Sequence, residues 1–478
     1  FLGLKTLSII KDAIRNIVAR FGEEANIDPD GIPLDDEATF ETFQRGETTA
    51  LFQFESEGMQ KHLRDLKPTN MEDLIAMNAL YRPGPMDNIP KFVARKHGRE
   101  PVEYPHEWLE EILKPTYGIM VYQEQIMQAA QIMAGYTLGQ ADMLRRAMGK
   151  KKAEEMAKHR KIFLEGATAK GVDEKKADEI FDTMARFASY GFNRSHAAAY
   201  SVLAFQTGWL KTHYPAEFMA SVLTHNKNNL DKVNFFLNEC KRMGLRILGP
   251  DVNESEMHFT VNEKGAIRFG LSALKGVGEG PVEAIMTERN ENGPYSDVFD
   301  FVRRQNQRVI NKKVMESLVL GGALDCFEDI HRAQYFAPTD RYETYLEHLL
   351  KFGGAVGQPE DAAQQSLFGD ADVMETVVLP EPPQVEPWTL IDKLTREKAI
   401  AGIYLSAHPL DQYKLEVEHV ANLTIDRIEE TRDQRFRIAA VVTGAQHRYS
   451  NKQGDMFGIF TIQDYRSEYE VKLFREDY

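Results

Sequence analysis

The sequence predicts a mainly α-helical protein of several domains, with the beginning of an OB-type β-barrel near its C-terminal end. Three observations predict this class. Apolar residues recur every three or four positions through most of residues 1–243, as on one face of a helix. A glycine hairpin between apolar helical segments follows at 271–285. Strand-like alternation appears at 247–269 and again over 431–478, where too few strands are present to close a barrel.

Composition and charge limit the kind of protein. The 478 residues are 42% hydrophobic and 27% charged, as in ordinary globular proteins. No apolar run approaches the ~20 residues that span a bilayer, so we expect no membrane partner. Cys240 and Cys326 lack neighbouring metal-ligand residues, which argues against a zinc site or a disulfide framework and predicts a reducing cytoplasm. The net charge of −15 argues against a protein that coats nucleic acid with its whole surface, but local basic clusters can still bind it.

Helical periodicity predicts a series of helices along the first half of the chain. They share apolar positions three or four residues apart and are bounded by capping or turn residues. The predicted helices cover residues 1–21, 36–45, 57–66, 70–81, 121–134, 153–169, 175–188, 196–214 and 217–225.

The segment DMLRRAMGKKK, residues 142–152, concentrates positive charge on a predicted helix. Its apolar positions are spaced to face a core, whereas Arg145, Arg146 and Lys150 share another face. Residues 141–170 hold nine Lys or Arg against four Asp or Glu, a local balance of +5. Such a face predicts an anion site, because the arginine fork suits phosphate oxygens. An ordinary solvated helix face would have the same pattern.

The turn LYRPGP, residues 80–85, breaks the helical pattern. Pro83 and Pro85 fix their own φ angles, and Pro85 also keeps Gly84 out of the helical region. The turn therefore aims Arg82 in a fixed direction, either as part of a binding site or only as part of a stiff loop.

The segment SYGFNRSH, residues 189–196, joins two predicted helices. Gly191 permits a tight turn, and Ser195 is expected to cap the helix that begins at His196. The free N–H groups of a helix N-terminus suit a phosphate, and Tyr190 or Phe192 has a ring that can stack on a base. An ordinary capped turn with buried aromatic side chains is the alternative.

The sequence LSALKGVGEGPVEAI, residues 271–285, fits a helix-hairpin-helix. Gly276, Gly278 and Gly280 allow a tight hairpin. Its backbone N–H groups would approach a DNA phosphate, assisted by Lys275. That contact positions a duplex without reading its sequence. A purely structural turn is the alternative.

A looser copy of this pattern follows at residues 309–324. It ends in two glycines, and Lys312 and Lys313 add positive charge. We therefore predict tandem DNA-binding elements within residues 244–352.

Residues 353–387 have the composition of a flexible acidic linker. They contain seven acidic residues and no Lys or Arg, with glycines and prolines at the two ends. Within this segment Leu367 and Phe368 form an adjacent apolar pair, and Gln364 precedes them as a polar anchor. An exposed Leu-Phe pair predicts docking to a partner, whereas a strap that packs on the protein's own core is the alternative.

The remaining chain is predicted to hold a helical connector and a small sheet. The connector covers residues 388–430, with a helix near 394–401. The strands are expected at 437–442, 457–464 and 470–474. An OB-type barrel begun by these strands would bind single-stranded nucleic acid by aromatic stacking and a basic groove.

Together these motifs closely resemble the C-family replicative DNA polymerases of bacteria, the alpha subunits of DNA polymerase III. The resemblance runs nearly from end to end. It rests on FLGLKTL, LYRPGP, GIMVYQEQIM, YTLGQADMLRRAMGKKK, YGFNRSHAAAYS, YPAEF, LKGVGEG, QQSLFG and SAHPL. It implies a fragment that begins just after the palm, with the fingers over 1–243, tandem hairpins over 244–352, a clamp-binding linker over 353–387, a helical connector over 388–430 and a truncated OB-type domain over 431–478.

In this family the fingers contact the triphosphate of the incoming nucleotide. The resemblance implies nucleotide-binding roles for Arg82, Arg145, Arg146, Lys150, Tyr190, Asn193, Ser195 and His196. Gln364, Leu367 and Phe368 match the motif that binds the sliding clamp, although Gln365 stands where that motif prefers an apolar residue.

The family extends a primer with deoxynucleoside triphosphates and Mg²⁺, which carboxylates of the palm hold. The resemblance places those carboxylates outside the chain, so it implies no catalytic residue, no metal and no cofactor in this fragment, which alone would be inactive. The implied partners are primer–template DNA, single-stranded template, deoxynucleotide, the sliding clamp and other subunits of the polymerase III holoenzyme. Two alternatives stay open, an error-prone member of the same family and a non-enzymatic DNA-binding repair scaffold.

Overall fold

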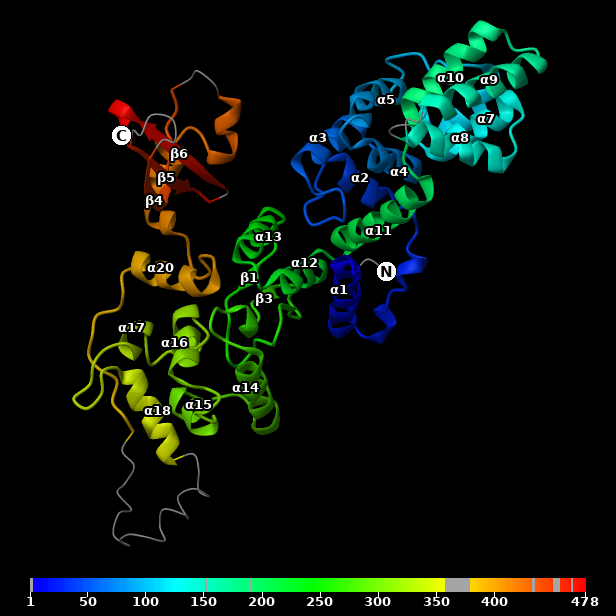
Figure 1. Ribbon diagram of the computed structural model, residues 1–478. Helices are drawn as coiled ribbons and strands as arrows, with labels where there is room; N and C mark the ends of the chain where they lie inside the picture. Colours follow the sequence, from blue (N-terminus) through cyan, green and yellow to red (C-terminus); the bar gives the residue numbers. More distant parts are fainter. Residues whose placement is uncertain are drawn as a thin grey trace. The chain divides into compact units, whose positions relative to one another are not determined.

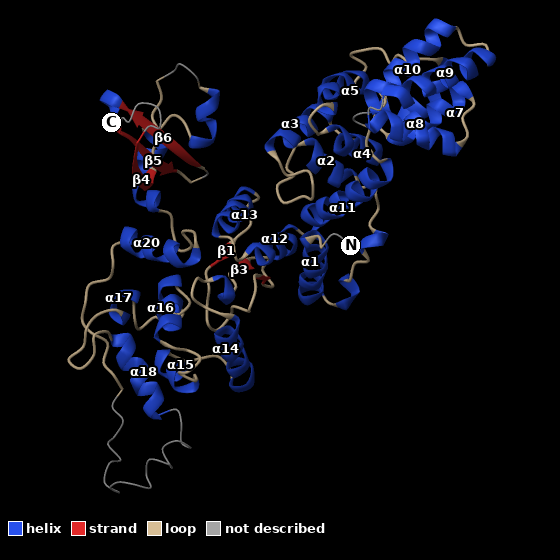
Figure 2. Ribbon diagram, in the orientation of Figure 1, coloured by secondary structure: helices blue, strands red, loops and turns tan. Residues whose placement is uncertain are grey.

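The computed structural model describes residues 3–150, 153–188, 191–356, 379–431, 435–449, 456–465 and 467–478. The chain forms two compact units, Phe1–Phe218 and Met219–Tyr478 (Figure 1). Helices dominate both units, and the strands formed by the described residues all belong to the second (Figure 2). The predicted class, mainly α with a small β part near the C-terminal end, is confirmed.

The first unit consists of short and medium helices. These are α1 (Lys5–Phe21), α2 (Glu37–Gln44), α3 (Glu57–Leu66), α4 (Met71–Leu80), α5 (Ile89–Lys96), α6 (Glu110–Leu113), α7 (Gln123–Ala134), α8 (Leu138–Lys150), α9 (Ala153–Ala169), α10 (Glu174–Ala188) and α11 (Arg194–His213), with α12 (Pro215–Asn226) beginning in it. Short polar side chains begin several of them: Asp36 accepts a hydrogen bond from the backbone N–H of Thr39 at 2.8 Å, and Asn70 from that of Asp73 at 3.1 Å. Each such bond satisfies an N–H group that has no partner inside the helix.

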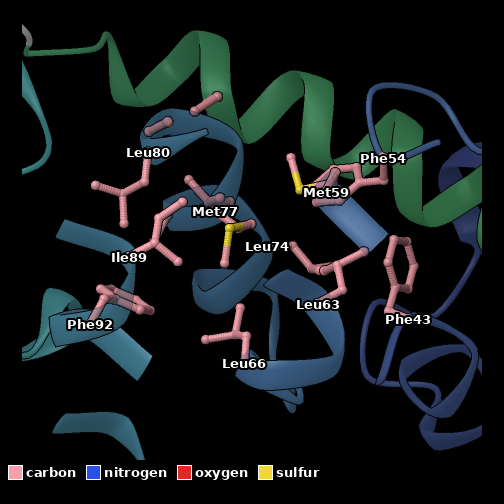
Figure 3. Close-up of a cluster of buried hydrophobic side chains, with 14 of the residues drawn as sticks. Phe43, Phe54, Met59, Leu63, Leu66, Leu74, Met77, Leu80, Ile89 and Phe92 are labelled. Carbon is pink, nitrogen blue, oxygen red and sulfur yellow. The ribbon is translucent and has the colours of Figure 1, made fainter. Parts of the chain in front are cut away.

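The long helix α11 covers one hydrophobic core of this unit. Side chains from α2, α3, α4 and α5 fill that core, and Figure 3 shows Phe43, Leu63 and Met77 among those that lie beneath the ribbon of α11. The helix α1 packs against the same α11. The core therefore fixes α11, whose N-terminal turn carries several of the candidate site residues.

Another hydrophobic core of this unit lies among α6, α7, α8, α9 and α10. The apolar face predicted for residues 142–152 turns inward here, since Leu144, Ala147 and Met148 are all buried. The opposite face of α8 carries Arg145 and Arg146. Burial of one face thus orients the arginines toward the other.

The second unit begins with helices around a small sheet. Its helices are the end of α12, α13 (Leu230–Arg242), α14 (Glu279–Asn292), α15 (Val298–Arg304), α16 (Lys312–Gly321), α17 (Arg332–Tyr335), α18 (Tyr345–Val356), α20 (Leu390–Ala401) and α21 (Lys414–His419). Three two-residue strands, β1 (Ile247–Leu248), β2 (Thr260–Val261) and β3 (Ile267–Arg268), form a sheet in the order β1-β3-β2. The strand β3 pairs with β1 in parallel and with β2 antiparallel.

Three longer strands, β4 (Val441–Tyr449), β5 (Met456–Gln463) and β6 (Glu468–Phe474), form an antiparallel sheet in sequence order. The predicted strand over 437–442 was wrong in its bounds, because β4 begins at Val441 and runs to Tyr449. Its pairing with β5 shifts register between Val442 and Gly444, which indicates an irregularity or bulge. The identification of this sheet with an OB-type barrel stays a prediction.

The described ends of the linker predicted over 353–387 are ordered. Residues 353–356 complete α18. In the segment 379–389, the carbonyl oxygen of Pro380 accepts a hydrogen bond from Tyr345 Oη at 2.8 Å, and that of Pro383 accepts one from Gln334 Nε2 at 3.0 Å. The described residues at the two ends of the predicted linker are thus held by helix α18 on one side and by side chains of α17 and α18 on the other, and the flexible acidic linker itself stays a prediction.

Candidate nucleic-acid interface

A short backbone pairing brings the start of α7 to the turn before α11. Tyr122 and Phe192 form an isolated parallel bridge. The N–H of Gln123 donates to the carbonyl of Phe192 at 2.9 Å, and the N–H of Phe192 donates to that of Val121 at 3.1 Å. Segments far apart in the sequence, 121–123 and 191–192, are thus fixed to each other by main-chain bonds.

Gln123 connects this turn to the basic helix α8. Its Nε2 donates to the carbonyl of Gly191 at 3.0 Å, while its Oε1 accepts from Arg145 Nη1 at 3.0 Å. A Cβ on Gly191 would lie 3.2 Å from Gln123 Cγ, so a larger residue would crowd this contact. One amide side chain therefore sets the position of Arg145 relative to the 191–196 turn.

Both arginines of α8 bind the same carboxylate. Arg145 donates to Asp142 Oδ1 from Nε at 2.9 Å and from Nη2 at 2.6 Å, and Arg146 Nη2 lies 2.8 Å from Asp142 Oδ2. The hydrogen bond from Arg145 is the main cause that lowers the pKa of Asp142, so this carboxylate stays charged. The Arg145 side chain is 26% exposed and that of Arg146 66%. Asp142 therefore balances part of the predicted basic face, and the side chain of Lys150 lies outside the described residues.

Arg82 lies against the same turn from the side of α4. Its Nε donates to the carbonyl of Ala79 at 2.9 Å, and its guanidinium carbon lies 4.3 Å from the centre of the Phe192 ring. Partial burial lowers the pKa of Arg82 from its usual value. The contact is a cation–π arrangement that holds Arg82 in one direction. The same contact places a guanidinium on the ring that the sequence suggested for base stacking.

Asn193, not Ser195, caps α11. The helix begins at Arg194, and Asn193 Oδ1 accepts from the N–H of His196 at 2.8 Å. The prediction for Ser195 was wrong because asparagine has the same capping ability and stands two residues earlier. Ser195 lies inside the first turn, where it and His196 are exposed. The His196 ring packs against Phe192, with centroids 5.4 Å apart, and against Tyr200 at 4.1 Å.

A carboxylate lies on the N-terminus of α11. The N–H of Arg194 donates to Glu124 Oε1 at 3.1 Å and Oε2 at 3.0 Å, and Asn193 Nδ2 donates to Oε1 at 2.8 Å. The side chain of Arg194 turns away to Glu72, with Nη2 2.5 Å from Oε1. The helix N-terminus that was predicted to suit a phosphate thus already holds an anionic group of the protein.

The structure brings Arg82, Arg145, Asn193, Ser195 and His196 to one region of the first unit. Arg146 shares Asp142 with Arg145, while Tyr190 lies outside the described residues. Sequence reasoning missed the four residues that organise this region, which are Glu72, Gln123, Glu124 and Arg194. The segment YQEQ offered one signal, because polar and acidic residues at a helix start often bind nearby N–H groups.

The predicted hairpin lies on the surface of the second unit. Lys275, Gly276, Gly278 and Gly280 are exposed, and the first helix of the pattern is a single 3₁₀ turn at Leu271–Ala273. Gly276 has φ +91°, and a Cβ there would lie 2.6 Å from Ser317 Oγ. No side chain caps the following helix α14. Within the hairpin, the N–H of Lys275 donates to the carbonyl of Ile400 at 3.0 Å.

The looser second copy supplies α16 and its two lysines. Lys312 pairs with Glu347 at 2.5 Å, and this hydrogen bond raises the pKa of Lys312. Lys313 is exposed, and its Cε lies 3.9 Å from the Cβ position of Gly276. Lys275 and Lys313 therefore lie near the same glycine turn, and neither forms an ion pair with any residue that the structure describes.

Other predicted features fall outside these contacts. Gln364, Leu367 and Phe368 lie outside the described residues. Among the residues with defined positions, no three His, Cys, Asp or Glu side chains are grouped to hold a metal ion. None of the described helices is long and apolar enough to cross a membrane.

The chain matches two family models and several known proteins. Residues 6–171 match the model of the bacterial DNA polymerase III alpha subunit finger domain, and residues 244–335 match a helix-hairpin-helix motif. The chain is 46% identical to the DNA polymerase III subunit alpha of Pseudomonas aeruginosa, 45% to that of Vibrio cholerae and 44% to that of Escherichia coli strain K12. Each match covers 100% of this chain and 42%, 41% and 41% of the respective relative. The chain thus spans about two fifths of the length of these relatives.

Proposed function

Because the chain belongs over its whole length to the family of bacterial DNA polymerase III alpha subunits, we propose that it binds the incoming deoxynucleotide and primer–template DNA in a replicative DNA polymerase. In this proposal the chain contributes to template-directed nucleotidyl transfer by positioning substrates. Carboxylates outside the chain would hold the Mg²⁺ ions that activate the primer hydroxyl and stabilise the transferred phosphate.

One observation carries the nucleotide part of the proposal. Gln123 connects Arg145 to the 191–196 turn, and Arg82 lies against Phe192 in that turn. The arrangement therefore gathers two guanidinium groups and a helix N-terminus in one region. Guanidinium forks and helix N-termini are the two protein groups best suited to phosphate oxygens. A triphosphate with several charges would engage more than one of them.

Replacing Gln123 with alanine tests this arrangement in the complete alpha subunit. The change leaves every arginine in place but removes the amide that holds Arg145 to the turn. We expect KM for deoxynucleotides to rise about three- to tenfold, the effect of losing one or two ordinary hydrogen bonds, with unchanged affinity for primer–template DNA. Steady-state incorporation at fixed DNA concentration gives KM. Gln128→Ala, an exposed change on the same helix, is the control. A loss confined to DNA affinity would contradict this placement.

The second unit is proposed to grip the duplex backbone. Its support is the exposed turn at Gly276, with Lys275 and Lys313 beside it, together with the helix-hairpin-helix match over residues 244–335. Backbone N–H groups and lysines contact phosphates in any sequence, so they provide grip without specificity. The antiparallel sheet β4–β6 is proposed to contact single-stranded template.

Substitution of the hairpin glycines should weaken duplex binding alike for unrelated sequences. Gly280→Ala is the sharper variant, because a Cβ there meets nothing within 4 Å and its effect would come from the approach of DNA. We expect a two- to tenfold loss of duplex affinity, about the value of one hydrogen bond, measured by titration at fixed salt with unchanged thermal unfolding. Gly276→Ala should reduce both affinity and stability, since its φ is +91°. Gly249→Ala, also in open space, is the control. Equal affinities for wild type and Gly280→Ala would exclude this contact.

The proposal also includes docking to the sliding clamp through Gln364, Leu367 and Phe368, and assembly with other holoenzyme subunits. The relatives from Pseudomonas aeruginosa, Vibrio cholerae and Escherichia coli are all DNA polymerase III alpha subunits, which supports a replicative over an error-prone member. A repair scaffold without polymerase function would have no use for a finger domain.

A further inference from the structure

The carboxylate of Glu124 occupies the anion-binding end of α11. It accepts hydrogen bonds from the main-chain N–H of Arg194 at 3.1 and 3.0 Å and from Asn193 Nδ2 at 2.8 Å. The helix is 20 residues long, so its N-terminus carries the full positive end of the helix dipole. Three donor contacts to one carboxylate are the pattern that a bound phosphate would make at this place.

A buried hydroxyl beside this carboxylate has no hydrogen-bond partner among the described residues. Tyr122 is 1% exposed, and its Oη is unpaired. It adjoins the same charges: burial raises the pKa of Tyr122, Glu72 and Glu124 raise it further, and Arg194 lowers it. An unpaired buried hydroxyl costs free energy unless some state of the molecule supplies a partner. Glu72 Oε2, on the carboxylate with the largest electrostatic effect on Tyr122, is buried and unpaired as well. Two polar groups close to the charges of this helix N-terminus therefore lack a partner among the described residues.

Glu124 is not needed to join α7 to α11. The main-chain bonds between Gln123, Phe192 and Val121 already hold the two segments together, and Gln123 Nε2 adds a bond to Gly191. Removing the charge of Glu124 therefore leaves these three hydrogen bonds intact. What the carboxylate adds is negative charge at the main-chain N–H of Arg194, the first residue of the helix.

We propose that Glu124 is an internal substitute for phosphate, which the triphosphate of the incoming deoxynucleotide displaces from the N-terminus of α11 when it binds. The inference rests on the proposed nucleotide-binding function and names the residue that competes with the substrate there. A carboxylate and a phosphate cannot share these donors, because like charges in contact repel strongly. The side chain of Glu124 must therefore move before the triphosphate engages the turn, and its hold on Arg194 and Asn193 reduces nucleotide affinity.

The test is Glu124→Gln in the complete alpha subunit, with inorganic tripolyphosphate as a probe of the phosphate site. Glutamine keeps the size and one acceptor oxygen but loses the charge that competes with phosphate. We expect KM for deoxynucleotides and the inhibition constant of tripolyphosphate both to fall about three- to tenfold, with kcat and primer–template affinity unchanged. Glu124→Ala, which removes the acceptor altogether, should lower both constants as well. Glu111→Gln changes net charge equally at an exposed place on α6 and should change neither.

Other outcomes overturn the inference. An unchanged or higher KM for both Glu124 variants would mean that Glu124 only links α7 to α11 and does not compete with the nucleotide. A tighter primer–template affinity with unchanged KM would mean that the displacing phosphate belongs to DNA. The proposed nucleotide function has its own test, because Arg145→Ala must raise KM whatever Glu124 does. If Arg145→Ala raises KM and Glu124→Gln does not lower it, only this inference fails.

Discussion

Arg145→Ala in the complete alpha subunit is expected to lower kcat/KM for deoxynucleotides by ten- to a hundredfold. A hydrogen bond to a charged group contributes about 1.5–3 kcal/mol, which corresponds to that range of rate. Arg146→Ala should have an effect of the same kind. The Arg146 side chain is 66% exposed, against 26% for Arg145, so replacing Arg146 should disturb the packing of the protein less.

The structure of α8 complicates the reading of Arg145→Ala in one way. Arg145 also binds Asp142 and Gln123, so its removal leaves a carboxylate without its strongest partner. Thermal unfolding of each variant separates this structural cost from the loss of a phosphate contact. Lys161→Ala is a suitable control, because Lys161 is a 79% exposed cation on the neighbouring helix α9.

The pattern of kinetic change decides the assignment. A contact with the triphosphate changes nucleotide efficiency and leaves the affinity for primer–template DNA as it was. If the two arginine variants lose DNA affinity at matched salt but keep KM for nucleotide, this face of α8 binds the template backbone instead. Equal values for wild type and both variants would restore the interpretation of an ordinary solvated helix face.

Local patterns in the sequence were sufficient for most of the helical fold. The spacing of Leu144, Ala147 and Met148 predicted which face of α8 is buried, and periodicity located α3, α4 and α9 to within a residue or two. Such patterns report on burial within one element. The helix α5 was missed because it has only eight residues, and the bounds of β4 were missed because most of that strand is exposed and shows little alternation.

The site was predicted only in part, because its geometry depends on contacts between distant segments. The sequence pointed to Arg82, Arg145 and the 191–196 turn separately. Nothing in the local pattern showed that Gln123 would bind both Arg145 and Gly191, or that Glu124 would reach Arg194, 70 residues away. The error at the cap has the same origin, since Asn193 and Ser195 are equally good caps by residue type.

Replacing Leu367 and Phe368 together with alanine is expected to abolish binding to the sliding clamp. Burying both side chains in an apolar pocket contributes about 3–6 kcal/mol before the cost of ordering the chain. Much of that gain is offset by the cost of ordering the segment, so the wild-type dissociation constant is expected to be about micromolar. The double variant should have no measurable affinity for the clamp. Titration of purified clamp against both proteins gives the result directly.

The residues on both sides of the motif are anchored to the second unit, and this makes a weak contact with the clamp useful. The helix α18 ends at Val356, and the segment after the motif is held by Tyr345 and Gln334 through Pro380 and Pro383. Both ends of the motif segment therefore belong to the second unit, which is also proposed to grip the duplex. A clamp on the same duplex would meet the motif at high effective concentration, so a weak contact can still support processive synthesis.

The double variant should accordingly shorten the products made on long templates with clamp present and leave incorporation on short primed templates unchanged. Leu379→Ala is the matched control, since Leu379 is an exposed apolar side chain at the end of the same segment. Gln365→Leu is expected to act in the opposite direction, because an apolar residue at that position fits the clamp-binding motif better. If the double variant binds the clamp as the wild type does, Leu367 and Phe368 only strap the segment to the protein's own surface, and the clamp must be held by other residues.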